Sequence, residues 1–188
     1  MKTYLYIIFA LLMIGCASPE NPAATKELWE FTPKNNHPNF DRACLPLLNS
    51  YQELMKGVAA DDTAYLFNAA KNMIQLTDSF PFGVLAPTDT VLNDQIKQSL
   101  SAINAELQGL IAEQNISAIH MATNMISVQF LNMLGAVGFK ERNIYIFNVN
   151  DENVEDGLIW FGWNKTAEDL YHKDKKGEVT AQQLLQEK

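Results

Sequence analysis

Residues 114–139 decide the fold, and they run QNISAIHMATNMISVQFLNMLGAVGF without a single Asp, Glu, Lys or Arg. Apolar residues recur there at three- and four-residue steps, which predicts one long helix. One face of this helix carries Ile119, Thr123, Ile126, Phe130, Met133 and Val137. At about 100° per residue, Met121, Met125 and Val128 fall on nearly the opposite face. A helix that is apolar on both sides is normally buried, so we predict the central helix of a bundle; the alternative is that one face meets a partner.

The same helix is too polar to be a membrane span. Its uncharged polar side chains include His120, Asn124, Ser127, Gln129 and Asn132. Polar groups of this kind are unfavourable in the hydrocarbon core of a bilayer. The sequence therefore favours a helix packed among other protein elements.

A first helix is predicted upstream, from roughly Phe40 to Lys56, on apolar residues spaced by three and four. Pro46 is awkward within it, because an interior proline costs about 3 kcal/mol. Either the regular helix starts near Leu45 or it kinks at Pro46. Gly57 is expected to mark its end.

Two more helices are predicted between the first helix and residues 114–139. Asp61 and Asp62 open one of them, and their carboxylates suit capping of a helix N-terminus; a catalytic pair is the alternative. Asp89 or Thr90 opens the next one, which runs to about Glu113.

After Gly138 the pattern changes from helical to extended. Ile144-Tyr145-Ile146-Phe147 and Leu158-Ile159-Trp160-Phe161 are β-branched or aromatic runs, joined by the acidic segment 150–157. They predict a β-hairpin with a long loop at about residues 143–163, and residues 179–186 predict a short closing helix. The expected fold class is mainly α, an up-down bundle of about four helices with a small C-terminal β-hairpin, in one domain over residues 39–188.

The N-terminus resembles a bacterial lipoprotein signal. Lys2 precedes a short apolar run from Leu5 to Ile14, and Gly15 stands directly before Cys16. A run this short is typical of a secretion signal, since a span needs about 20 apolar residues. The resemblance implies removal of residues 1–15 as a signal peptide and lipidation of Cys16. It places the chain in the bacterial cell envelope, anchored on a periplasmic or outer-membrane face.

Residues 16–38 are predicted to form the lipidated cysteine and its tether, because they hold four prolines and no sustained periodicity. Within them, Leu28-Trp29-Glu30-Phe31 contains two large aromatic side chains. Free tethers rarely carry two such residues. We therefore expect this segment to dock on the domain.

Charge and cysteine content narrow the function classes. Removing Lys2 with the leader leaves 13 basic against 22 acidic residues, a net charge of −9. An acidic body disfavours nucleic acid as a partner. With Cys16 acylated, Cys44 has no partner for an internal disulfide and no thiolate cluster for zinc or iron–sulfur is possible. We interpret Cys44 as a small buried hydrophobe, with an intermolecular disulfide or a reactive thiol as the alternatives.

Three motifs resemble a family of uncharacterised bacterial envelope helical domains often found beside copper-efflux membrane-fusion proteins. The matches are Val58-Ala59-Ala60-Asp61-Asp62, Ala69-Ala70 and Gly157-Leu158-Ile159-Trp160. The resemblance implies a helical bundle and a link to soft-metal handling. This chain departs from the family where Phe147-Asn148-Val149 replaces a Cys-Pro-Met element and Leu170-Tyr171 is all that remains of Asn-Pro-Tyr. The implied metal role thereby loses its most plausible ligand.

Two metal sites can be considered from the residues alone. His120, Met121 and Met125 offer imidazole and thioether groups, which suit copper(I). His120 and Met125 lie about 140° apart on the helix, so a copper site needs another element, and core packing is the alternative. Asp151, Asn153 and Glu155 alternate as in a calcium loop, but the required glycine and glutamate positions are not filled, which favours a solvated hairpin tip.

Aromatic side chains concentrate in the hairpin region, and one face of the hairpin must pack on the bundle. We favour simple core packing of this cluster. The alternative is a binding surface on the other face, for which Trp160, Trp163 and Tyr171 are the candidates. The chain has neither a Gly-x-Ser-x-Gly elbow nor a phosphate-binding glycine loop. We therefore expect no catalytic residues and no cofactor.

The sequence thus predicts a lipid-anchored, non-enzymatic binding or accessory module whose partner is another envelope protein or a small ligand. An accessory to copper export is the alternative, on the family resemblance and the methionines. A hydrolase is a second alternative, for which Asp61, Asp62 and His172 would have to converge in a cleft.

Overall fold

The computed structural model describes residues 38–84, 90–151, 154–172 and 178–185. The predicted signal peptide, Cys16 and the tether up to residue 37 lie outside these ranges. Four long helices account for most of the described chain: α2 (Pro38–Ala60), α3 (Thr63–Asp78), α4 (Thr90–Ala112) and α5 (Ile116–Val137). A short 3₁₀ helix, η1 (Phe82–Val84), follows α3. None of the described helices is both long enough and apolar enough to cross a bilayer.

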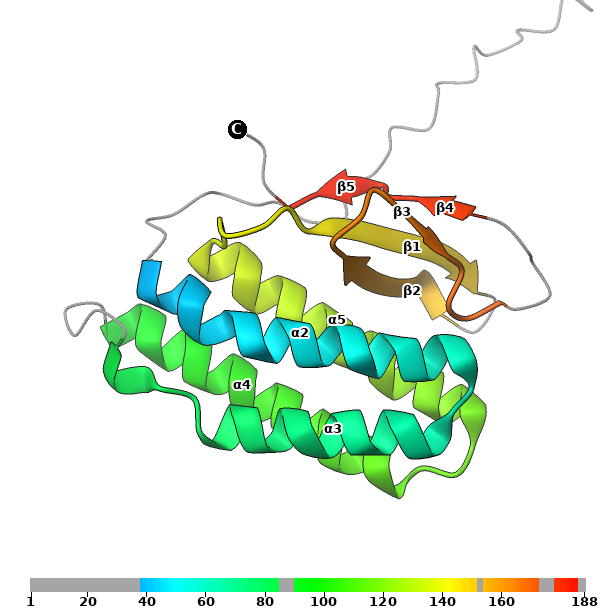
Figure 1. The fold of residues 1–188 in the computed structure, drawn as a ribbon, viewed down its shortest axis with the longest axis horizontal. Helices are drawn as coiled ribbons and strands as arrows, with labels where there is room; N and C mark the ends of the chain where they lie inside the picture. The colour runs from blue at the N-terminus through cyan, green and yellow to red at the C-terminus, as the bar shows by residue number, and fades with distance from the viewer. Residues whose placement is uncertain (1–37, 85–89, 152–153, 173–177, 186–188) are drawn as a thin grey trace, which may run out of the picture.

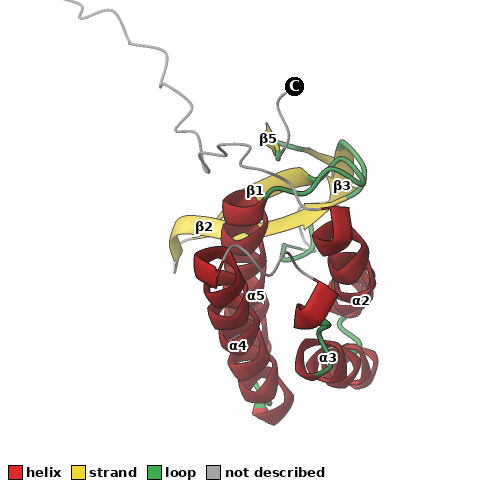
Figure 2. Ribbon diagram, turned by 90° about the vertical axis from the view of Figure 1, so that its left-hand side faces the viewer, coloured by secondary structure: helices red, strands yellow, loops and turns green. Residues whose placement is uncertain are grey.

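Each helix packs on the next in chain order, so the predicted up-down bundle is confirmed. Figures 1 and 2 show two helix layers, with α2 and α5 next to the strands and α3 and α4 on the side away from them. The predicted central helix is α5, and ten of its residues are buried. Asn115 caps its N-terminus by accepting from the amide of Ser117, and Gly138, at φ 81°, ends it.

The turn from α2 to α3 is held by hydrogen bonds at the C-terminus of α2 and at the N-terminus of α3. The amide of Asp61 donates to the carbonyl of Val58, and the amide of Asp62 donates to the carbonyl of Gly57, as in a Schellman motif. Asp61 takes the left-handed position at φ 51°. The Asp62 side chain accepts from the amide of Tyr65 at 2.9 Å and caps α3. The capping interpretation of this aspartate pair is therefore confirmed for Asp62.

Gly57 does not end α2, contrary to the prediction, because the helix continues to Ala60. A Cβ atom at Gly57 would lie 2.8 Å from both Cα and Cβ of Leu66 on α3. The glycine is there to let two helix backbones approach closely. The helix begins at Pro38, close to the predicted Phe40, and contains Pro46, so the alternative of a regular helix that starts only near Leu45 is wrong.

The predicted hairpin is formed by β1 (Tyr145–Asp151) and β2 (Val154–Gly162), which pair antiparallel. The prediction of a long acidic loop between the strands was wrong. Asp151 already pairs with Val154, so the strands run through the acidic segment. Gly157 makes this possible at φ 75°, where a Cβ would lie 2.3 Å from Oδ1 of Asn148 and 2.5 Å from the carbonyl oxygen of Val149. The ladder is irregular at this point, so the glycine accommodates a bulge.

The closing helix predicted at residues 179–186 is also wrong. Residues 178–180 form β4, which pairs with β3 (Thr166–Glu168), and residues 183–184 form β5, which pairs with β1. Gln182 donates its amide to Ile146 and Leu185 donates to Ile144. The edge of β1 offers backbone partners that local helix propensity does not anticipate.

The three-stranded sheet has the order β2-β1-β5, and it stands on its β2 edge above α2 and α5 (Figure 1). The strands β3 and β4 form a separate pair beside it. The β2 edge is hydrogen-bonded to the helices, and Phe161 on one face of β2 also packs on them. Four consecutive residues of β2, from Leu158 to Phe161, are buried.

Replacing Gly57 by Ala should destabilise the bundle by about 1–3 kcal/mol, because the new methyl group meets backbone atoms of α3. Gly109 on α4 is the matched control, since a Cβ there meets nothing within 4 Å. Gly109→Ala should stabilise by up to about 1 kcal/mol through helix propensity. Urea unfolding followed by circular dichroism measures both. Equal effects of the two substitutions would contradict the close-approach role of Gly57.

Candidate functional site

The favoured core packing is confirmed for Trp160 and Tyr171, two of the three candidate binding aromatics, which have exposures of 2% and 7%. The Trp160 ring stacks on Phe147 with centroids 5.2 Å apart, and its other neighbour is the edge-on ring of Tyr171 at 5.7 Å. The expectation that only one face of the hairpin packs is wrong, because Phe161 on the opposite face packs on the helices. Trp163 remains half-buried, with the Arg142 guanidinium 4.6 Å from its ring centre.

Tyr51 of α2 joins three elements at the centre of the molecule. Its ring stacks on Phe161 at 4.0 Å and meets the ring of Phe130 of α5 edge-on at 5.4 Å. Its hydroxyl is 2.7 Å from that of Ser127 and accepts from the amide of Phe161 at 3.4 Å. Burial raises the pKa of Tyr51 well above its ordinary value, so the phenol stays neutral.

Side chains of α2 and α5 satisfy the edge of β2 that faces them. Asn124 accepts from the amide of Ile159 at 2.7 Å, and Gln52 donates to the carbonyl of Phe161 at 3.2 Å. With the Tyr51 hydroxyl, these groups take the place of a neighbouring strand. Asn124 contributed to the sequence prediction only as evidence against a membrane span, and nothing in its spacing announced this role.

The outer face of α5 carries what we call the methionine stripe: Met121, Met125, Val128 and Asn132, spaced by four, three and four residues. Met121 and Met125 are each 38% exposed, Val128 is half-buried and Asn132 is exposed. Burial of α5 on all sides was therefore wrong for this face. The stripe has no formal charge and forms an accessible, partly apolar surface of α5, which also exposes Ile116 in its first turn.

His120, the imidazole of the copper hypothesis, contacts an aromatic ring. Its ring meets the ring of Tyr171 edge-on at 5.1 Å, on the side of α5 that faces the strands. Burial raises the pKa of the Tyr171 hydroxyl. Within the described residues, His, Cys, Asp and Glu side chains form no group of three able to hold a metal ion. The imidazole of His120 thus has an aromatic neighbour, and the copper hypothesis for His120, Met121 and Met125 stays a prediction.

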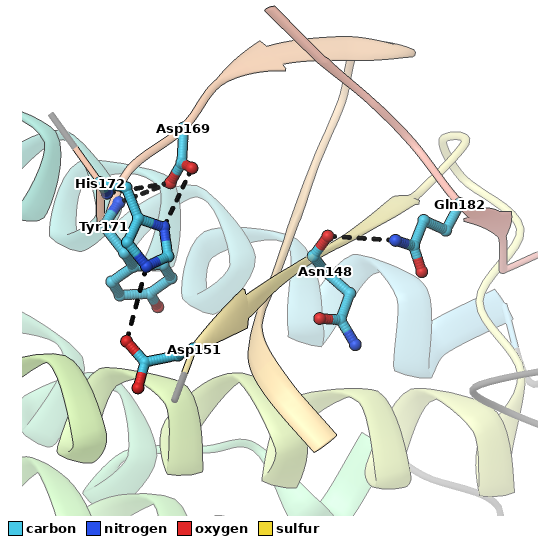
Figure 3. Close-up of polar contacts among 6 residues, drawn as sticks. All are labelled: Asn148, Asp151, Asp169, Tyr171, His172 and Gln182. Carbon is cyan, nitrogen blue, oxygen red and sulfur yellow. Dashed lines mark hydrogen bonds and ion pairs between the residues drawn. The ribbon is translucent and has the colours of Figure 1, made fainter. Parts of the chain in front are cut away.

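A cluster that the sequence did not predict forms around His172 (Figure 3). Its Nδ1 is 3.1 Å from a carboxylate oxygen of Asp169, and its Nε2 is 3.5 Å from a carboxylate oxygen of Asp151 at the end of β1. The second oxygen of Asp169 accepts from the amides of Tyr171 and His172. The Asp-x-x-His spacing was the one signal available, and it does not reveal Asp151.

This cluster bears on two sequence hypotheses. For a hydrolase, His172 would have to act with Asp61 and Asp62, but both of its ring nitrogens face Asp151 and Asp169, while Asp62 caps α3. For a calcium loop, Asp151 lies instead in β1 and contacts the imidazole. Asn153 and the side chain of Glu155 lie outside the described part of the chain. The cluster fastens the turn that carries Tyr171 onto the end of β1.

Cys44 is fully buried in α2, as predicted for a small core residue. Burial, with a smaller contribution from the charge of Asp41, raises the pKa of its thiol. Because the thiolate is the reactive form, this cysteine is inert in the native state. Asp41 itself accepts from the amide of Lys140 at 3.1 Å and joins the start of α2 to the chain after α5.

Comparisons with protein-family models, curated proteins and solved structures found no match to this chain. The resemblance to the envelope-domain family therefore stays a prediction.

Replacing Asn124 by Ala should cost about 1–3 kcal/mol of unfolding free energy, because the amide of Ile159 would lose its acceptor in a buried place. Asn132→Ala, on the exposed stripe of the same helix, is the control and should change stability by less than about 0.5 kcal/mol. Chemical denaturation distinguishes them. If Asn124→Ala were as mild as the control, the edge of β2 would not depend on α5.

Proposed function

We propose that this protein is a lipid-anchored envelope protein that acts without catalysis, by binding another envelope protein through the methionine stripe of α5. The observation that carries the proposal is the 38% exposure of both Met121 and Met125 on a helix with no formal charge. Tyr65, Val91 and Ile116 are also exposed, but Met121 and Met125 lie one turn apart on the same face of one helix. Flexible, polarisable methionines are common on surfaces that bind partner proteins.

The rest of the molecule supports a binding role. His172 is held between two carboxylates, Cys44 is buried, and the aromatic cluster is occupied by core packing. The net charge of −8 for the whole chain disfavours nucleic acid as the partner. These features leave recognition by an apolar face as the activity that the geometry supports best.

The location in this proposal comes from the leader sequence. The short apolar run and Gly15-Cys16 support a precursor that is cleaved and acylated, which leaves the domain attached to a membrane by residues 16–37. Two or more acyl chains give stable anchoring where one does not. A tethered domain of this kind meets its partner at a high local concentration.

Soft-metal export is the second candidate. Met121 and Met125 place two thioethers one turn apart on the same exposed side, and thioethers prefer copper(I). The ring of His120 lies edge-on against the ring of Tyr171. The partner-binding proposal explains the uncharged residues on either side of the methionines as well, and we favour it for that reason.

Metabolic labelling with a palmitate analogue tests the anchor. The full-length protein should incorporate the label and sediment with membranes. The Cys16→Ser variant should lose the label entirely and accumulate with its leader uncleaved. Label retained by Cys16→Ser, or absent from the unmodified protein, would contradict lipidation at this residue.

Photo-crosslinking from the stripe tests partner binding. A benzophenone amino acid at Met121 or Met125 should give one ultraviolet-dependent adduct of the same mass, while the same probe at Gln98, exposed on α4, should give none. Met125→Glu should lower the yield from position 121 at least ten-fold, because a carboxylate would have to lose its water in the interface. The proposal fails if Gln98 and the two methionine positions give the same adducts.

A further inference from the structure

A groove lies between the first half of α2 and the chain that follows α3, at the end of the molecule where the described chain begins. Its volume is about 370 Å³. Its floor is apolar, made by Ala43, Pro46, Leu47, Leu76, Phe80 and Pro81. Asn39, Arg42 and Ser79 form its polar rim. This size is at the lower end of the range of about 300–1,000 Å³ typical of small-ligand sites.

We propose that the groove is the docking site of the chain's own segment Leu28-Trp29-Glu30-Phe31. These four residues are the most apolar stretch between Cys16 and Pro38. The groove begins one residue after Pro38, so the segment and its site are neighbours along the chain. The two aromatic side chains match the apolar floor in kind, and Glu30 between them is complementary in charge to Arg42 on the rim.

The connecting chain is long enough for this contact. Seven peptide units separate Phe31 from Pro38 and can span up to about 24 Å when extended. The groove follows α2 from Asn39 to Leu47, which is about 12 Å along the helix axis at 1.5 Å per residue. The segment can therefore turn back and reach the whole floor.

Pro46 supplies a second reason to expect a tryptophan in the groove, because an indole combines an apolar ring with an N–H donor. It has no amide hydrogen to donate to the carbonyl of Arg42 one turn earlier, and both residues line the groove. That carbonyl oxygen can accept from the indole N–H of Trp29, which needs a partner when the ring is buried. An exposed proline inside a helix thus becomes part of the recognition site.

Docking of residues 28–31 shortens the part of the chain that can extend between Cys16 and the bundle. From Cys16 to Pro38 an extended chain could reach about 75 Å, but from Cys16 to Trp29 it reaches only about 45 Å. The bundle would then be held nearer the membrane, with the start of α2 toward it. The contact itself is independent of the anchor, whereas this consequence rests on the proposed lipidation of Cys16.

Disulfide trapping in the Cys16→Ser chain tests the contact without the anchor. Leu28→Cys with Ser79→Cys places one thiol in the segment and one on the rim, and should form an intramolecular disulfide at least ten-fold faster than Leu28→Cys with Lys140→Cys. Lys140 is the matched control, because its amide contacts Asp41 in the first turn of α2 but it does not line the groove. Equal rates, or disulfide-linked dimers in place of the internal bond, overturn the proposal.

Two further variants make the result specific. Ala43→Trp fills the groove from α2, and Arg42→Glu reverses the charge that faces Glu30 while changing only an exposed side chain. Each should slow the Leu28–Ser79 disulfide to the control rate. The fluorescence of Trp29 is the difference between the spectra of the chain and of its Trp29→Phe variant. This difference should be blue-shifted and shielded from quenching by acrylamide. Unchanged trapping in both variants, or a Trp29 signal as accessible as in urea, would show that something other than this segment belongs in the groove.

Discussion

The open edge of β2 is the constraint on which the rest of the structure depends. An unpaired strand edge buried against helices would leave amides and carbonyls without partners, at a cost of about 1–3 kcal/mol for each such group. Asn124, Tyr51 and Gln52 meet this requirement from two helices that are far apart in sequence. Their geometry fixes the angle between the sheet and the bundle, because the side chains must lie level with Ile159 and Phe161.

Standing the sheet on its edge has consequences for both of its faces. Phe161 packs on Tyr51 and Phe130 on one side, and Trp160 packs on Tyr171 on the other. The cluster of His172 with Asp151 and Asp169 then holds the turn that brings Tyr171 into place (Figure 3). These aromatic residues are thus buried in the core. Accessible apolar surface lies elsewhere, on the methionine stripe and in the groove beside α2.

Much of the bundle could be predicted from sequence, because a helix core repeats every three or four residues. The inner faces of α3, α4 and α5, the cap at Asp62 and the hairpin strands follow from such local patterns. The errors fell where a distant element changed the local preference. Gly57 allows α3 to approach α2 within the helix, and the edge of β1 draws residues 183–184 into a strand. For Trp160 and Tyr171 the favoured core packing is confirmed, but the alternative of a binding surface stayed open because the sequence shows alternation along a strand and not which faces are covered.

The sequence by itself determined the kind of elements, their order and the uncharged character of α5, since these depend on residues close together in the chain. It also contains the stretch that resembles a lipoprotein signal and the aromatic residues 28–31, which no packing argument requires. Only the tertiary structure decided that Trp160 and Tyr171 are core, that Met121 and Met125 are accessible, and that His172 lies between two aspartates. The physical reason is that burial and hydrogen bonding at these positions are set by residues tens of positions away, and a local pattern contains no information on where those residues come to lie.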